Sequence, residues 1–313
     1  MGNRALIKEM KNILIYIFAL LMPVAVSAQV LPFVAADYSA GAMAKAGANA
    51  TETSSTAFAS FENIAAVPYS DKSADLALGY TLWQPSSVSS NVILVGGSYN
   101  LADKLGFALG MTYGMLPEYD IFNDNGSHKG TYTPSDVQVN AGASWRFLPF
   151  LSAGVNLGYA SSSLAEGVSY GAFNADVFLM SKFADYKVAL GLTDLGSAVV
   201  SASDVRFSLP SALTLGLGYD KTFVDVHKVD VALDLDYYFD GHVAASIGAD
   251  YTFNNMISFL AGYRYGGNSV IPSYASLGLG GRFFGVNLDL AYVLPVAKSP
   301  MSNTLSLAVG YSF

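Results

Sequence analysis

The chain has 313 residues, of which 52% are hydrophobic and only 13% are charged, whereas a soluble domain typically carries about 25% charged residues. Its 24 acidic residues outnumber its 16 lysines and arginines and give a formal net charge of −8, which argues against nucleic acid as a partner. No cysteine is present, and this excludes disulfides, thiolate chemistry and a lipid-anchored N-terminal cysteine.

Residues 1–28 have the pattern of a secretory signal peptide. Lys8 and Lys11 precede a short apolar run over 13–26, and small residues suited to cleavage follow up to Ala28. We therefore expect an exported protein whose signal is removed near Ala28. Met10 is an alternative start, because the residues after it form a compact signal by themselves. A membrane anchor fits less well, since the apolar run is short and contains a proline.

Residues 29–70 differ from everything that follows, because they are rich in Ala, Ser, Thr and Gly and show little sustained alternation. We expect this stretch to be a plug-like segment that folds against or inside a later structure. We interpret Gly41 and Gly47 as positions where its backbone passes close to the wall of that structure.

From Asp71 to the C-terminus, apolar and polar residues alternate in segment after segment. The segment 229–237 has apolar residues at every odd position, so a strand there has one apolar face and one polar face. No run of about 20 apolar residues exists that could form a spanning helix, and only helices and closed barrels satisfy their backbone in a bilayer. The pattern predicts an all-β fold, a transmembrane antiparallel β-barrel over 71–313 with about 14 strands. The expected strands are 73–83, 88–100, 104–115, 135–147, 150–163, 171–183, 185–194, 208–219, 226–239, 242–253, 256–265, 272–284, 285–294 and 301–313.

A row of aspartates falls on the polar face of the predicted strands. Asp230, Asp234 and Asp236 share one strand, Asp250 lies on the next, and Asp289 lies nearer the C-terminus. Paired carboxylates for acid–base catalysis would need surroundings that separate their pKa values, and no sequence feature supplies them. We interpret the row as a hydrated lumen wall, hydrogen-bonded to the N-terminal segment.

The connections and the aromatic residues give the barrel an orientation. Short links alternate with longer ones, and in outer-membrane barrels the short links are periplasmic. Aromatic residues gather at the strand ends on the apolar face, as expected for the two interfaces of a bilayer. We expect the final Tyr311 and Phe313 to act as the C-terminal barrel signal. The chain is therefore predicted to lie in the outer membrane of a Gram-negative cell, in contact with its lipid.

The sequence predicts no enzyme, no cofactor and no metal. His128, His227 and His242 fall in separate places, so they cannot form one catalytic or metal-binding group. The stretch 120–126 does not match a calcium loop, because Ile121 occupies its first ligand position. An outer-membrane lipase or protease would need a constellation of residues that the chain lacks.

Three glycine pairs have no phosphate-binding context, because none opens a helix after a strand. We expect them at bends and bulges of the curved sheet. The pairs are Gly96-Gly97, Gly266-Gly267 and Gly280-Gly281.

Several stretches resemble the PorV/PorQ proteins, which belong to the FadL-like barrels of the Bacteroidota outer membrane. The segment 36–48, with Gly41, Met43 and Gly47, is similar to the opening of that family. The segment 61–65 keeps an asparagine, Asn63, and the alanine of the family's aromatic-Asn-Pro-Ala signature, but it lacks the proline. The stretches 80–83, 123–126 and 130–136 are similar to the family's first strand and its entry into the fourth.

This resemblance implies a 14-stranded FadL-like barrel with the N-terminal segment in or beneath its lumen. It further implies a non-enzymatic component of type IX secretion, whose protein partners are translocon, attachment or assembly subunits and exported cargo. The alternative is a FadL-like outer-membrane transporter of hydrophobic small molecules. That alternative predicts an apolar pocket and a lateral opening marked by a kinked strand.

Overall fold

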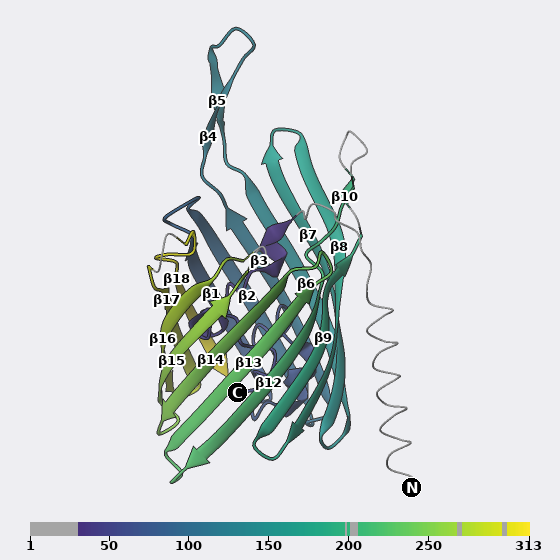
Figure 1. Ribbon diagram of the computed structural model, residues 1–313, viewed down its shortest axis with the longest axis vertical. Coiled ribbons are helices and arrows are strands. Elements are labelled where there is room, and N and C mark those ends of the chain that lie inside the picture. The colour runs from purple at the N-terminus through teal and green to yellow at the C-terminus, as the bar shows by residue number, and fades with distance from the viewer. Residues whose placement is uncertain (1–30, 198, 201–205, 268–270, 296–298) are drawn as a thin grey trace.

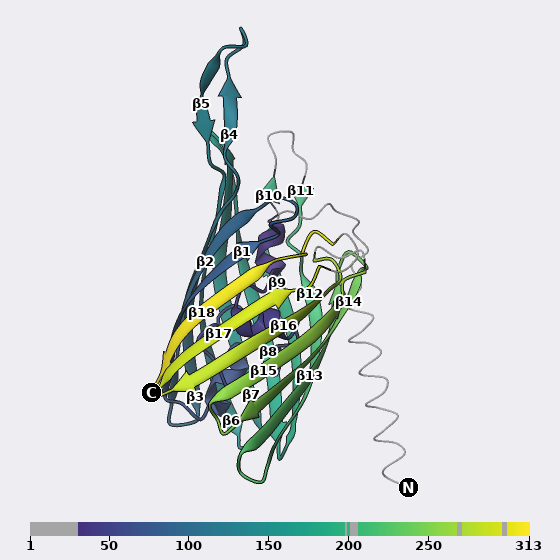
Figure 2. The same cartoon turned by 90° about the vertical axis from the view of Figure 1, so that its left-hand side faces the viewer.

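A computed structural model describes residues 31–313 except 198, 201–205, 268–270 and 296–298. The signal peptide predicted over 1–28 and the cleavage expected near Ala28 lie outside the described residues. Fourteen antiparallel strands close into one barrel, in the order β1-β18-β17-β16-β15-β14-β13-β12-β9-β8-β7-β6-β3-β2 (Figures 1 and 2). The barrel strands are β1 Ala74–Trp83, β2 Ser90–Leu101, β3 Leu105–Met115, β6 Ser135–Leu148, β7 Leu151–Ala165, β8 Val168–Phe183, β9 Tyr186–Gly196, β12 Ala212–Phe223, β13 His227–Tyr238, β14 Val243–Phe253, β15 Ile257–Tyr265, β16 Tyr274–Phe283, β17 Val286–Val293 and β18 Leu305–Ser312.

The alternation in the sequence becomes an apolar outer wall and a polar inner wall. In β13, Val231 and Leu235 are exposed on the outside, whereas Asp230 and Asp234 are buried on the inside. Leucines over the rest of the wall are exposed in the same way, and Leu157 reaches 63%. A continuous apolar surface of this kind would be unfavourable in water and is favourable in lipid. The predicted all-β barrel is confirmed. No helix in the described part of the chain is long and apolar enough to span a membrane.

The two ends of the barrel differ. At one end, named here the short-turn end, links of two or three residues place two successive residues in the left-handed region, as at Ala102-Asp103 and Asn254-Asn255. At the other end, named the loop end, the connections are longer and carry two extra hairpins. One is β4 Tyr119–Phe122 with β5 His128–Tyr132, which projects far beyond the barrel (Figures 1 and 2); the other is β10 Val199–Val200 with β11 Arg206–Phe207.

Two sequence predictions about the wall are wrong. A loop was expected over 164–170, but β7 and β8 continue through it and leave only residues 166–167 between them. The apolar alternation stops there because these strand ends extend past the apolar band. Gly96-Gly97 and Gly280-Gly281 are not bulges, since the ladder register runs unbroken through both pairs. The register shifts lie in β6–β7, β7–β8 and β8–β9 instead.

Residues 31–70 lie inside the barrel and are named the plug (Figures 1 and 2). The plug holds the 3-10 helices η1 Pro32–Ala35 and η2 Ile64–Tyr69 and the short helix α2 Ala40–Ala44. α2 begins because the side chain of Ser39 accepts the Ala42 N–H at 3.2 Å, and Asn63 caps η2 by accepting the Ala65 N–H at 2.9 Å. α2 packs on β16–β18, and η2 packs on β3, β6 and β7.

Candidate functional site

The first three aspartates of the acidic row face the lumen, and each has a different partner. Asp234 is 2% exposed and its Oδ2 accepts the backbone N–H groups of Asn49 and Ala50, both at 2.8 Å. Asp230 accepts a hydrogen bond from Lys187 at 2.5 Å. Asp236 pairs with Arg264, and the closest atoms are 3.3 Å apart. The row therefore anchors the plug and balances buried cations.

Asp250 and Asp289 lie on the same inner face, nearer the short-turn end. Asp250 accepts the hydroxyl of Thr252 at 3.0 Å, and Asp289 lies 3.9 Å from Arg282. In the described structure, neither makes a hydrogen bond or ion pair to the plug. Each of the five carboxylates of the row thus interacts with a partner of its own, and the row is not arranged as a catalytic pair of carboxylates.

The buried cations of the lumen were not singled out from the sequence. Lys187 has a side chain only 1% exposed and lies 2.5 Å from Asp230 and 3.2 Å from Asp220. Lys45, on the plug, forms an ion pair with Glu52. The usable signal for Lys187 was its position on the polar face of a predicted strand. Lys45 gave no such signal, because the plug has no alternation.

The residues of the family-like motif hold the plug in different ways. Met43 is completely buried in the main apolar cluster. Gly47 has a φ of +83°, and a Cβ there would lie 2.8 Å from Asp37. Asn63 donates to the carbonyl of Ala50 at 2.6 Å. The expectation that Gly41 lies against the wall is wrong, because a Cβ built on it would have no atom within 4 Å.

The plug approaches the barrel wall most closely at glycines that belong to the wall rather than to the plug. A Cβ on Gly262 would lie 2.3 Å from the carbonyl carbon of Lys45, and one on Gly248 would lie 2.6 Å from its Cβ. A Cβ on Gly278 would lie 2.4 Å from that of Ala44. These glycines occupy neighbouring strands, and Gly248 and Gly262 are direct partners in the ladder. We call them glycine seats; others of the same kind are Gly96, Gly106, Gly110, Gly154, Gly216 and Gly218.

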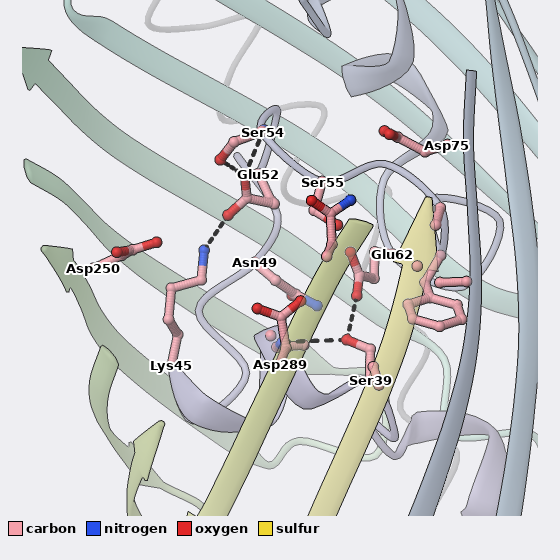
Figure 3. A pocket seen from close by; sticks show the side chains of 18 of the residues that line it. Ser39, Lys45, Asn49, Glu52, Ser54, Ser55, Glu62, Asp75, Asp250 and Asp289 are labelled. Carbon is pink, nitrogen blue, oxygen red and sulfur yellow. Dashed lines mark hydrogen bonds and ion pairs between the residues drawn. The ribbon is translucent and has the colours of Figure 1, made fainter. Parts of the chain in front are cut away.

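The described residues of the plug and wall enclose an inner and an outer chamber. The inner chamber, of about 50 Å³, lies between α2 and the β14–β18 wall and is bordered by Lys45, Glu52, Asp250 and Asp289. Figure 3 shows Lys45 pointing to Glu52 and a bond between Ser39 and Glu62. In that bond the Ser39 hydroxyl donates to Glu62 at 2.8 Å. The outer chamber, of about 100 Å³, lies nearer the loop end, between η1 and the β9, β12 and β13 wall.

The chambers form a series with the short-turn mouth of the barrel. A vestibule of about 430 Å³ opens between the turns at Asn255 and Gly285. The vestibule and the inner chamber share Asp250 and Arg282, and the inner and outer chambers share Asn49 and Glu62. The lumen thus contains a polar series of cavities that the plug interrupts.

An apolar cluster covers the loop end of this series. Leu31 and Phe33 of the plug are buried there with residues of the loop-end connections. Tyr38 packs edge-on against Trp83, with ring centroids 4.9 Å apart. We call this cluster the outer cap; its members from the connections and strand ends are Trp83, Val199, Leu209, Ile271, Tyr274, Val293 and Met301.

Burial changes the acidity of several plug carboxyls. Burial raises the pKa of Glu62 to about 7, although the hydrogen bond from Ser39 lowers it. Burial also raises the pKa of Asp37 to about 6, against the nearby positive charge of Arg264. Burial acts in the same sense on Glu52, but the charges of Lys45 and Lys187 and the hydrogen bonds from Lys45 and Ser54 together outweigh it and hold that pKa well below its ordinary value.

The histidines and the 120–126 stretch show no sign of catalysis. His128 lies on the projecting hairpin, 3.1 Å from Asp120, and His227 and His242 lie at opposite ends of the β13–β14 hairpin. Residues 123–127 form a turn closed by the Gly126 N–H to the Asn123 carbonyl at 2.8 Å. Among the described residues, no group of three or more His, Cys, Asp or Glu is placed to hold a metal ion.

The expected apolar pocket is not among the lumen cavities described above, which are bordered by charged residues. In the described part of the chain, an apolar hollow of about 660 Å³ lies instead on the outer, lipid-facing side of β1, β2, β3 and β6, around Gly97. The strand irregularity closest to a kink is in β9, where two residues, Thr193 and Asp194, lie opposite the single residue Asp176 of β8. Asp194 also has a φ of 52°, in the left-handed region. Thr193 and Asp194 both border the outer chamber.

No family model matches the chain, and no curated protein matches it. Solved structures of other proteins do match its fold. The toluene transporter TodX of Pseudomonas putida is similar at a TM-score of 0.64 and 14% identity, covering 92% of this chain and 99% of that one. The toluene transporter TbuX of Ralstonia pickettii is similar at 0.61 and 13%, covering 88% and 97%. A FadL homologue of Pseudomonas aeruginosa is similar at 0.52 and 12%, covering 92% and 100%. The fold is therefore that of the FadL-like outer-membrane barrels.

Proposed function

We propose that the protein is a plug-gated outer-membrane channel for small molecules with an apolar part. The observation that carries this proposal is the series of cavities along the lumen, covered at the loop end by the apolar outer cap. Solved barrels of the same fold include toluene transporters, which supports this function over a secretion role. The apolar wall and the short and long connections support a place in the outer membrane.

The residues of the outer cap are buried against one another, so a solute that enters from the outside has to part them, and an apolar solute gains by leaving water among them. Passage beyond the cap requires the plug to shift, since the glycine seats leave no free space where it contacts the wall. The β9 irregularity beside the outer chamber is the place where the wall is least regular. The proposal therefore makes the plug the gate.

Uptake into intact cells tests the channel. Cells that make the barrel are expected to accumulate radiolabelled toluene several-fold faster than cells that lack it. A variant in which Leu31 and Phe33 are replaced by serine is expected to lose most of this gain, because it removes the plug's part of the outer cap. Equal uptake by all three strains would contradict the proposal.

A second candidate is the interaction component of a secretion machine that the PorV/PorQ resemblance predicts. The β4–β5 hairpin favours it, since it projects beyond the barrel and exposes Phe122 at 60% and Tyr119 at 40%. Purification from native outer membrane in mild detergent, with and without residues 118–133, tests it. Recovery of translocon, attachment or assembly subunits that depends on the hairpin would support this function, and recovery of the barrel alone would count against it.

A further inference from the structure

Gly97 creates a hollow in the outer face of the wall. Val95 and Tyr99, its neighbours on the same face of β2, are exposed, so position 97 also faces the lipid. Its ladder partners, Leu76 of β1 and Leu109 of β3, are exposed as well. A glycine among four large side chains leaves a dent between them. We call the resulting cavity of about 660 Å³ the lipid-facing hollow.

The lipid-facing hollow has the size and the lining of a binding site for a hydrocarbon chain. Pockets for small ligands typically have volumes of about 300–1,000 Å³. The side chains that form this hollow are aliphatic or aromatic. Ser98 borders it through its backbone, because its hydroxyl faces the lumen and is bonded to Thr56 of the plug at 2.8 Å. An unfilled dent would forfeit dispersion contacts, so a chain that fits the dent is favoured there.

Three unused hydrogen-bond donors lie at the end of the hollow nearest the short turns. Tyr99 and Phe107 are ladder partners and form the last row of the lining. Lys104 lies exposed in the turn beyond this row, and Trp145 of β6, opposite Leu105, is 59% exposed. The side chains of Tyr99, Lys104 and Trp145 donate no hydrogen bond within the described structure. Tyr and Trp gather where a membrane meets water, so this end lies at the level of lipid head groups.

The charge of Lys104 is not neutralised by the protein. It has no ion-pair partner within 4.0 Å among the described residues. Asp103, in the same turn, instead accepts the amide of Asn100 at 3.0 Å. Lys221, elsewhere at this end of the barrel, does have a partner and pairs with Asp185 at 3.1 Å. A free ammonium group beside two further donors suits a phosphate group.

The hollow and the donors together favour one occupant. A second copy of this barrel would bring an apolar wall of the same kind, and a hydrocarbon solute has no acceptor, so neither would use the donors. A phospholipid carries both a hydrocarbon chain and a phosphate. Lys104 lies three positions before Phe107, about 10 Å along the strand, which places it within reach of the head group of a chain lying in the hollow.

We propose that the lipid-facing hollow is a binding site for one anionic phospholipid, with an acyl chain beside Gly97 and the phosphate at Tyr99, Lys104 and Trp145. The site lies on the outer face of the wall, so this inference goes beyond the proposed channel and does not rest on it. It also gives the Gly96-Gly97 pair two roles. Gly96 receives the plug on the inner face, and Gly97 receives the lipid on the outer face.

Native mass spectrometry of the full-length barrel in detergent tests the ligand class. The probes are phosphatidylglycerol and phosphatidylcholine with identical palmitoyl and oleoyl chains. One phosphatidylglycerol is expected to bind about fivefold more tightly than one phosphatidylcholine, the effect of a single lysine near a lipid surface. Equal affinities for the two lipids, or binding that does not saturate at one molecule, would overturn the assignment.

Filling the hollow tests its place. Gly97→Leu is expected to weaken binding of both lipids several-fold. A Cβ there would come within 2.7 Å of Leu76, but only of the end of its flexible side chain, so the barrel is expected to fold. Ala249→Leu is the control, because it enlarges an exposed residue of β14 outside the hollow and is expected to leave binding unchanged. The same affinity in both variants would overturn the assignment.

Neutralising the cation tests the head group. Lys104→Gln is expected to abolish the preference for phosphatidylglycerol. Lys72→Gln removes a charge beside the vestibule instead and is expected to keep the preference. Heat-dependent gel mobility verifies that each barrel is folded, and the lysine variants give a result even if Gly97→Leu does not fold. A preference that survives in Lys104→Gln would overturn the assignment.

Two further readouts identify the other occupants. A dimer of the unaltered chain that Gly97→Leu dissociates would assign the hollow to a second copy. Loss of toluene uptake in Gly97→Leu with unchanged lipid binding would assign it to the solute. Either result would overturn the lipid site, whereas failure of uptake in every strain would refute the channel and leave the lipid site.

Discussion

The plug contacts the barrel in two contrasting ways. Over β14–β16 its backbone lies directly on the wall, because Gly248, Gly262 and Gly278 leave no room for a side chain. Over β12 and β13 it is held through Asp234 as well as on the glycine seats Gly216 and Gly218, and beside these contacts it encloses the outer chamber with β9. The first contact depends on shape, and the second adds hydrogen bonds to a carboxylate. The difference indicates that the glycine side fixes the plug, while the chamber side is where a solute can be accommodated.

The largest effect is expected from filling a glycine seat. Gly262→Ala puts a methyl group 2.3 Å from a backbone carbon of Lys45, and a backbone cannot give way as a flexible side chain does. We expect a loss of about 1–3 kcal/mol in stability and release of the plug to protease. Gly114→Ala is the control, since its nearest atom would be 3.6 Å away. Equal melting temperatures for the two variants would show that the seats do not fix the plug.

Removing the charged anchor is expected to have a somewhat smaller effect. Asp234→Ala leaves the N–H groups of Asn49 and Ala50 without their acceptor. A cost of about 2 kcal/mol is expected, with faster hydrogen exchange confined to the plug near these two residues. Asp289→Ala is the matched control, because the bonds described for Asp289 do not include the plug. Identical exchange in both variants would contradict the anchor.

The wall could be predicted from the sequence, and the fit of the plug could not. Alternation along 229–237 was enough to orient Asp230, Asp234 and their neighbours, because strand geometry is local. The alternation failed at 164–170, where β7 and β8 leave the apolar band and lose their apolar face. Gly262 gave no signal, since its role depends on Lys45, which is more than 200 positions away in sequence. Lys187 and Asp230 became a pair only when β12 joined β9 on one side to β13 on the other.

The smallest effect concerns pH. Burial raises the pKa of Glu62 from 4.5 to about 7, so the seated plug binds its proton more tightly than a released plug does. Stability of the seated plug is therefore highest below pH 4.5, falls as pH rises through 4.5 to 7, and is level above that. Because Glu62 keeps some exposure, we expect a change of about 1–2 kcal/mol. Asp37, with a pKa of about 6, acts in the same direction.

Thermal unfolding at pH 5 and pH 8 measures this change. Glu62→Gln has no proton to lose and is expected to show a weaker pH dependence than the unaltered chain, retaining the part due to Asp37. An identical pH dependence in the two proteins would mean that Glu62 is ionised in the seated plug.

A reversible lock between plug and wall tests the gate most directly. Thr56 and Ser98 join the plug to β2 through hydroxyl oxygens 2.8 Å apart, and the chain has no cysteine of its own to interfere. Thr56→Cys with Ser98→Cys, once oxidised, is expected to abolish toluene uptake into intact cells, and dithiothreitol is expected to restore it. Ser98→Cys alone is the control. Undiminished uptake through the oxidised, locked barrel would contradict a gate formed by the plug.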